Sequence, residues 1–113
     1  MTKQVRVVSS CAAAPAGMTG FSTSNQANTG DWLEYHIAYI NNGIKTISEL
    51  NIRDALPAQT GYGSAHCQDV PTGASCQLVS SPTASSDAIH FLIQGGGIAP
   101  AATGSVRFCV QVL

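Results

Sequence analysis

The chain has 113 residues and a formal net charge of −1, and only 10% of its residues are charged. This length fits a single domain. Binding to nucleic acid or to an anionic membrane surface requires a clustered basic field, and the five cations are scattered along the sequence, which argues against both classes of partner. No stretch approaches the ~20 consecutive apolar residues of a membrane span.

Apolar residues alternate with polar ones in most segments, and no window of adequate length has the spacing of an amphipathic helix. The first strand is expected over residues 4–9. An Ala-, Pro- and Gly-rich loop follows over residues 11–20, and residues 21–24 are expected to form a short edge piece. Residues 1–27 are therefore predicted to be an N-terminal strand with a loop.

The clearest strand covers residues 31–41, and Asn42-Gly43 closes it because this pair tolerates the positive φ of a tight turn. Five more strands are expected over residues 47–54, 60–67, 75–80, 89–93 and 106–112. Short strands at this spacing predict an all-β fold: an immunoglobulin-like antiparallel β-sandwich of about seven strands, in one domain that covers residues 1–113.

One side of each strand is expected to form the core, because successive side chains point to opposite faces of a sheet. His36 and His90 fall on the other side of their strands, and both are expected to be exposed. The predicted inward set is Leu33, Tyr35, Ile37, Tyr39, Leu50, Ile52, Ile89, Phe91, Ile93, Val106, Phe108, Val110 and Val112.

Three apolar residues, Trp32, Ile40 and Leu92, fall on the outward side of their strands. Two interpretations stay open at this point. The three side chains form an apolar patch for a neighbouring molecule, or a loop such as residues 11–20 covers part of them.

The four cysteines are Cys11, Cys67, Cys76 and Cys109, and their even number in a short chain favours two disulfides and an oxidising compartment. Four cysteines allow three connectivities. Cys67 and Cys76 lie on strands that a short loop joins, so we predict a bridge between them. The second bridge, Cys11–Cys109, would then tie the first strand region to the last strand.

No catalytic residue, cofactor or metal site is predicted. The spacing of Cys67, Cys76 and His66 does not match the paired cysteines of a zinc site. Asp31 and Asp54 are expected to cap turns. Asp87 could complete a serine–histidine–carboxylate set only formally, since no Gly-x-Ser-x-Gly turn supports it.

A lysine crosslink of the kind found in other surface sandwiches requires a buried lysine. Lys3 is expected at a frayed terminus and Lys45 in a turn, and burial of an unpaired ammonium group is costly. No such crosslink is predicted.

Three segments carry a resemblance to a known family. Residues 29–43 read TGDWLEYHIAYINNG, residues 50–57 read LNIRDALP, and residues 97–108 read GIAPAATGSVRF. In this order they resemble the prokaryotic surface repeat called domain of unknown function eleven. The resemblance covers roughly residues 28–113. In that family a Gly follows the Pro of the last turn, where this chain has Ala101 after Pro100.

The resemblance implies an immunoglobulin-like sandwich in large exported proteins of bacteria and archaea, with no shared catalytic residue. The expected function is a non-enzymatic structural module of a cell-surface assembly such as a stalk, adhesin or filament, with neighbouring copies or domains as partners. One alternative is a filament subunit that donates its N-terminal strand to the next subunit. Another is a module whose loops bind a protein or glycan of a host or cell surface.

Overall fold

The computed structural model describes residues 1–14, 17–23, 26–81 and 88–113. In these residues there are seven strands, and no helix long and apolar enough to cross a membrane occurs in them. The strands are β1 (Thr2–Val8), β2 (Trp32–Ile40), β3 (Leu50–Ala55), β4 (Thr60–Asp69), β5 (Ala74–Ser80), β6 (Ala88–Gly95) and β7 (Thr103–Val112).

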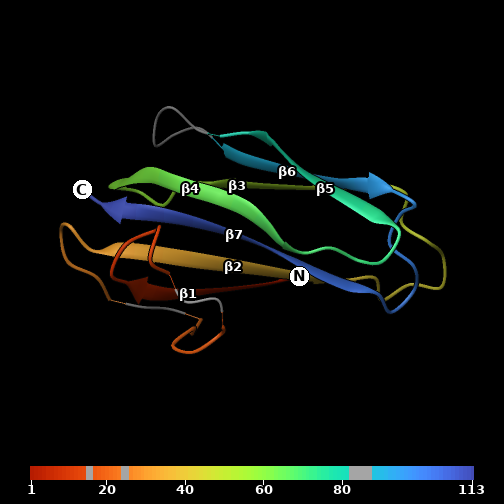
Figure 1. Cartoon of the computed structure of the whole chain (residues 1–113), viewed down its shortest axis with the longest axis horizontal. Helices are drawn as coiled ribbons and strands as arrows, with labels where there is room; N and C mark the ends of the chain where they lie inside the picture. Colours follow the sequence, from red (N-terminus) through yellow and green to blue (C-terminus); the bar gives the residue numbers. More distant parts are fainter. Residues whose placement is uncertain (15–16, 24–25, 82–87) are drawn as a thin grey trace.

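The strands form two antiparallel sheets, one with the order β1-β2-β7-β4 and one with the order β3-β6-β5 (Figure 1). The chain passes from one sheet to the other after β2, β3, β4 and β6. This arrangement confirms the all-β, immunoglobulin-like sandwich that the alternating pattern predicted.

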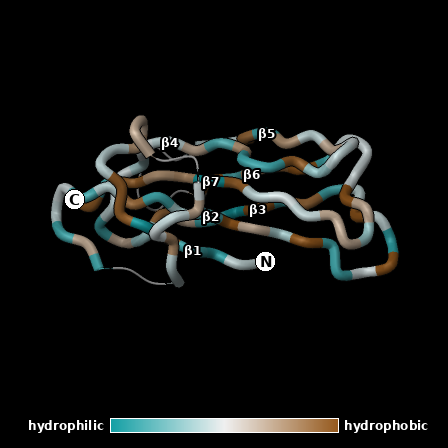
Figure 2. Tube along the Cα trace, turned by 60° about the horizontal axis from the view of Figure 1, so that its bottom comes forward, coloured by the Kyte–Doolittle hydropathy of each residue, from teal (hydrophilic) through white to brown (hydrophobic). Residues whose placement is uncertain are grey.

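The core lies between the sheets and consists of the predicted inward set. Tyr35, Leu50 and Val112 are partly buried against it, and the other members of the set are buried. Hydrophobic and hydrophilic positions alternate along the strands in Figure 2. Leu56 and Ile98, which lie in connections between strands, are buried in the same cluster.

The short loop expected between the strands of Cys67 and Cys76 is present, but the strands that it joins, β4 and β5, do not pair with each other as a hairpin. β4 pairs only with β7 and β5 only with β6, so the two strands belong to different sheets. Residues 70–73 cross from one layer to the other at the edge of the sandwich. Both strands turn their apolar sides toward the shared core, a pattern that alternation alone does not distinguish from a hairpin.

Asn41 follows β2 and connects the segment after β2 with the segment before β7. Its side chain is almost fully buried. Its Nδ2 donates to the carbonyls of Lys45 at 2.7 Å and Ile98 at 2.9 Å, and its Oδ1 accepts from the backbone N–H of Gly43 at 2.9 Å. The Asn-x-Gly sequence is therefore more than a turn signal, because one amide group holds together the chain after β2 and the chain before β7.

The last turn adopts a backbone conformation that favours glycine. Ala101 has a φ of 66°, in the left-handed region, and its N–H donates to the carbonyl of Asn41 at 2.8 Å. An L-residue with a Cβ is strained there.

We expect Ala101→Gly to stabilise the fold by about 1 kcal/mol, because it removes the Cβ that makes a positive φ unfavourable. Urea denaturation would measure the change. The matched control is Ala102→Gly, one residue later and without a positive φ, which should cost about 0.5–1 kcal/mol. Equal destabilisation by both changes would contradict the strained turn.

β1 is held on both sides. It pairs with β2 from Thr2 opposite Ala38 to Val8 opposite Trp32. On its other side Val5 exchanges two backbone hydrogen bonds with Ser22, at 2.8 and 3.0 Å. The edge piece expected at residues 21–24 is thus a single bridge at Ser22, and residue 24 lies outside the described residues.

The two ends of the chain lie at opposite ends of the four-stranded sheet. β1 starts level with Ala38, whereas β7 ends beside Trp32, at the other end of β2. In Figure 1 the C-terminus accordingly lies at the left end and the N-terminus to the right of centre. β1 and β7 run in the same direction, with only β2 between them.

Candidate functional site

The structure contains both predicted disulfides, so none of the four cysteines is free. Cys67 of β4 and Cys76 of β5 join across the edge where the two sheets meet, with their Cα atoms 6.2 Å apart. This bridge therefore links sheet to sheet. Two disulfides in so short a chain indicate an oxidising, extracytoplasmic environment.

The second bridge lies on the outer face of the four-stranded sheet. Cys109 of β7 points away from the core, and Cys11 reaches it from the segment after β1, with a Cα–Cα distance of 5.7 Å. Gly63 of β4 makes room for it, since a Cβ there would lie 2.6 Å from Sγ of Cys11 and 3.3 Å from the ring of Trp32. The segment after β1 is thereby fixed over this face.

Under that segment three charged residues form a buried cluster, which we call the outer-face cluster: Arg6 of β1, Glu34 of β2 and Arg107 of β7. Each of them is no more than 3% exposed. Nε of Arg6 donates to Oε1 of Glu34 at 2.9 Å, and an Nη of Arg107 donates to the same oxygen at 3.3 Å. Two guanidinium groups thus share one carboxylate.

The covering segment supplies the remaining acceptors. Arg6 donates to the carbonyls of Gly17 and Thr19, both at 2.9 Å, and Arg107 donates to the carbonyl of Gly17 at 3.2 Å. The ring of Phe21 lies over both guanidinium groups, with its centroid 4.2 Å from Cζ of Arg6. Carbonyl oxygens and an aromatic face compensate the excess positive charge, which explains why two arginines tolerate burial.

No sequence motif indicates the outer-face cluster, because Arg6 and Glu34 are 28 residues apart and Glu34 and Arg107 are 73 residues apart. One signal was present. Arg6, Glu34 and Arg107 all lie on the polar side of apolar strands, and three such strands paired side by side would place them together. Only the strand order, which the pattern does not give, brings them into contact.

His36 is buried, contrary to the prediction that it would be exposed. It points to the outer face as expected from alternation, but it is only 9% exposed. The ring of Phe21 lies 5.6 Å from it, centroid to centroid. The prediction was wrong because it took the outer face of the sheet to be in contact with water, whereas the segment after β1 covers it. His90, on the other sheet, is half-buried and contacts Oδ1 of Asn51 at 2.7 Å.

Burial lowers the pKa of His36 below the ordinary value, because the charged imidazolium is desolvated, and Arg107 lowers it further. The carboxylates of Asp69 and Glu34 act in the opposite direction, and Arg6 adds a small lowering effect. The folded protein therefore favours neutral His36.

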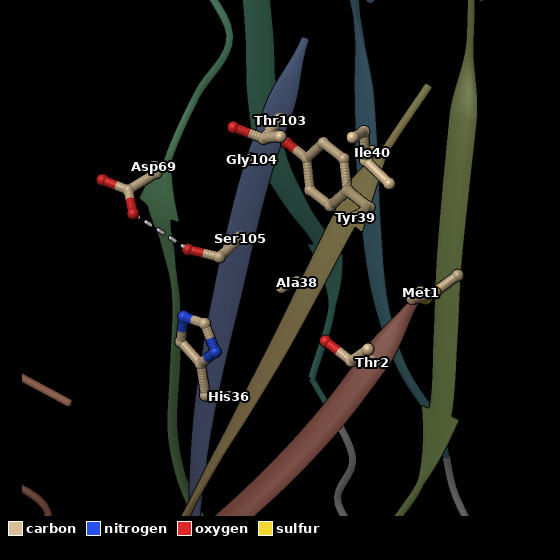
Figure 3. Close-up of a pocket in the computed structure, with 10 residues that line it drawn as sticks. All are labelled: Met1, Thr2, His36, Ala38, Tyr39, Ile40, Asp69, Thr103, Gly104 and Ser105. Carbon is tan, nitrogen blue, oxygen red and sulfur yellow. Dashed lines mark hydrogen bonds between the residues drawn. The ribbon is translucent and has the colours of Figure 1, made fainter. Parts of the chain in front are cut away.

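Next to His36 an open groove of about 430 Å³ runs along the same face (Figure 3). Oγ of Ser105 donates to Oδ2 of Asp69 at 3.2 Å, and no hydrogen bond joins His36 to either residue in the described structure. A serine nucleophile needs a base that accepts its proton. Here the hydroxyl is directed to a carboxylate that faces solvent, so we assign no catalytic role to the groove.

No metal-ligating constellation is evident. In the part of the chain that the structure describes, no group of three or more His, Cys, Asp or Glu side chains comes close enough to hold a metal ion. Asp31 accepts a hydrogen bond from the backbone N–H of Asn28 at 2.9 Å, as expected of a residue that caps a turn. Asp87 lies outside the described residues.

Asp54 and Lys3 differ from their predicted roles. Asp54 lies within β3 and not in a turn, and Lys3 lies within β1 and not in a frayed end. Their side chains form an ion pair of 2.7 Å between the two sheets, and Lys3 Nζ lies 4.9 Å from the ring centroid of Tyr35. Because Lys3 is 42% exposed, the pair contributes little stability.

The proposed apolar patch is not continuous. Trp32 and Ile40 face outward from β2, but Leu92 faces outward from β6 in the other sheet, on the opposite side of the sandwich. Trp32 is half-buried beside Cys11, which agrees with cover by the loop, whereas Ile40 is 46% exposed at the groove. The loop interpretation thus holds for Trp32.

Comparison of the chain with protein-family models, with curated proteins and with solved structures found no match.

We expect Glu34→Gln to destabilise the fold by about 3–5 kcal/mol, because it leaves two guanidinium groups buried side by side without their shared carboxylate. Denaturant unfolding followed by tryptophan fluorescence would measure it. Glu49→Gln is the matched control, since Glu49 is exposed and its replacement should change stability by less than about 0.5 kcal/mol. Similar small effects of both changes would show that the outer-face cluster is not desolvated.

Stability should fall as the pH decreases from about 7.5 to 5.5, and His36 should contribute to the fall. The unfolded chain binds a proton near pH 6.5, whereas folded His36 binds it only at lower pH. The unfolded state therefore gains protons first, and stability is lost as the pH falls through the unfolded pKa. Denaturant unfolding at both pH values should show a smaller loss for His36→Gln than for wild type. The surface variant His66→Gln should retain the full loss, and an unchanged loss in His36→Gln would contradict this assignment.

Proposed function

We propose that this domain is a non-enzymatic structural module of an exported cell-surface assembly, one unit of a stalk, adhesin or filament. The observation that carries the proposal is the placement of the chain ends, at opposite ends of the four-stranded sheet. A domain of this kind can be joined to one neighbour at each end and lengthen a row, with its long dimension of 44 Å along the row.

Two further features support a structural role. Disulfides brace the sandwich at two places, one between the sheets and one between the covering segment and β7. The low content of charged residues keeps repulsion between neighbouring copies small. In the groove beside His36, the hydroxyl of Ser105 donates to Asp69 and is not activated as a nucleophile.

The resemblance to domain of unknown function eleven supports the same proposal. The three segments that carry it include the turn with Asn41 and the strained turn at Ala101, which contact each other in the fold. Their joint occurrence therefore has a structural reason. We propose membership of that family on this basis.

Donation of the N-terminal strand to a neighbouring subunit has weaker support. β1 lies between β2 and Ser22, and its Arg6 belongs to the outer-face cluster. Only Ser9 and Ser10 separate β1 from Cys11, which is bonded to Cys109 of the same chain. A donated strand could therefore reach about 10 Å from its own domain. Loop-based binding of a protein or glycan has no supporting cluster of side chains in the loops that the structure describes.

Antibodies against the folded domain should label intact, unpermeabilised cells of the organism that makes it, and an added protease should remove the label. An abundant cytoplasmic protein, probed in parallel, must stay unlabelled until the cells are permeabilised. Detection of the domain only after permeabilisation would contradict a place in a surface assembly.

A further inference from the structure

In a row of domains each unit transmits a pull between its two ends, and the role described here rests on the proposed function as such a unit. Tension applied through the termini enters at β1 and leaves at β7. Without a crosslink, the tension would act on the whole chain between β1 and β7. The sandwich would then lengthen by unfolding. The position of Cys11–Cys109 changes the path.

The bridge joins the chain just after the first strand to the chain just before its end. Residues 12–108, which include β2 to β6, form a closed loop behind the bond. A pull on the ends follows β1 to Cys11, crosses the disulfide to Cys109 and continues to Leu113. We propose that Cys11–Cys109 carries tension past the sandwich, so that a pull on the ends cannot extend residues 12–108 while the bond is intact.

The folded geometry already spans about half of the full length of this path. Ten residue steps lead to Cys11 and four follow Cys109, which together span at most about 50 Å, and the bridge adds 5.7 Å between Cα atoms. Thr2 lies level with Ser105 through Ala38. Seven residues of β7 and two strand spacings therefore separate the ends of the folded chain by about 30 Å.

The extended path is longer than the folded separation of the ends by about 25 Å. This is the gain in length when β1 detaches completely. With Cys11–Cys109 open, full unfolding would instead release nearly the whole chain. Only the nine residue steps closed by Cys67–Cys76 would remain hidden. The gain would then be about 340 Å, more than ten times larger. The two bridges therefore make unequal contributions to extensibility, although both brace the fold.

The surroundings of the bridge fit this role. Gly63 admits the sulfur of Cys11, and Trp32 lies against the same place. The pull acts along β1 and would shear it against β2. The hydrogen bonds along the whole pairing, from Thr2 opposite Ala38 to Val8 opposite Trp32, therefore bear the load together. Rupture of the β1–β2 pairing would lengthen the domain by the gain of about 25 Å. The rest of the sandwich would stay attached through Cys11–Cys109.

Single-molecule force spectroscopy on several copies linked in tandem tests the proposal. Oxidised wild type should show no unfolding step longer than about 25 Å per domain. Cys67→Ser/Cys76→Ser, which keeps Cys11–Cys109, is the matched control and should also show only short steps. Cys11→Ser/Cys109→Ser should show steps of about 340 Å.

Long steps in oxidised wild type would overturn the proposal, whatever the variants do. If Cys11→Ser/Cys109→Ser does not fold, a thiol reductant added to stretched wild type replaces it, and bond cleavage should release the long step. The force result is independent of where the protein resides in the cell. Failure here would leave the surface-labelling result intact, and failure of labelling would leave the force path intact.

Discussion

The bond between Cys11 and Cys109 fixes the segment after the first strand onto the outer face of the four-stranded sheet, and the buried chemistry of that face depends on it. An outer face of an antiparallel sheet is ordinarily wet. Here the fixed segment places the carbonyls of Gly17 and Thr19 and the ring of Phe21 above two arginines. The sheet is therefore covered on both sides, by the core and by a single loop.

A shared carboxylate between two arginines is a weak source of net stability, because desolvation of three charges offsets most of their attraction. Its stronger effect is on register. Arg6, Glu34 and Arg107 come from three adjacent strands. A slip of one residue between any two of them would turn a guanidinium or the carboxylate into the apolar core. The outer-face cluster thus selects one alignment of β1, β2 and β7 among those that the apolar pattern permits.

The fold could be predicted further than the site. Alternation located all seven strands and the core, since a half-buried strand must place its apolar residues two apart. Both disulfides were predicted from the even number of cysteines and the short loop between Cys67 and Cys76, which left Cys11 and Cys109 as the second pair. Alternation did not tell that β4 and β5 lie in different sheets, because both strands present an apolar side to the same core in either arrangement. The burial of His36 and the meeting of Arg6 with Arg107 depend on strand order and on a loop of small residues that has no periodic pattern.

The pairing of cysteines has a consequence for biosynthesis. The ribosome makes the chain in the N-to-C direction, so Cys11 and Cys67 both exist before either has its partner, and they are not partners of each other. Cys76 follows Cys67 after nine residues, whereas Cys109 is the last of the four to be made. An oxidant that acts on the growing chain before Cys76 is made finds Cys11 and Cys67 as the first available pair, and a bond between them has to be released by thiol–disulfide exchange.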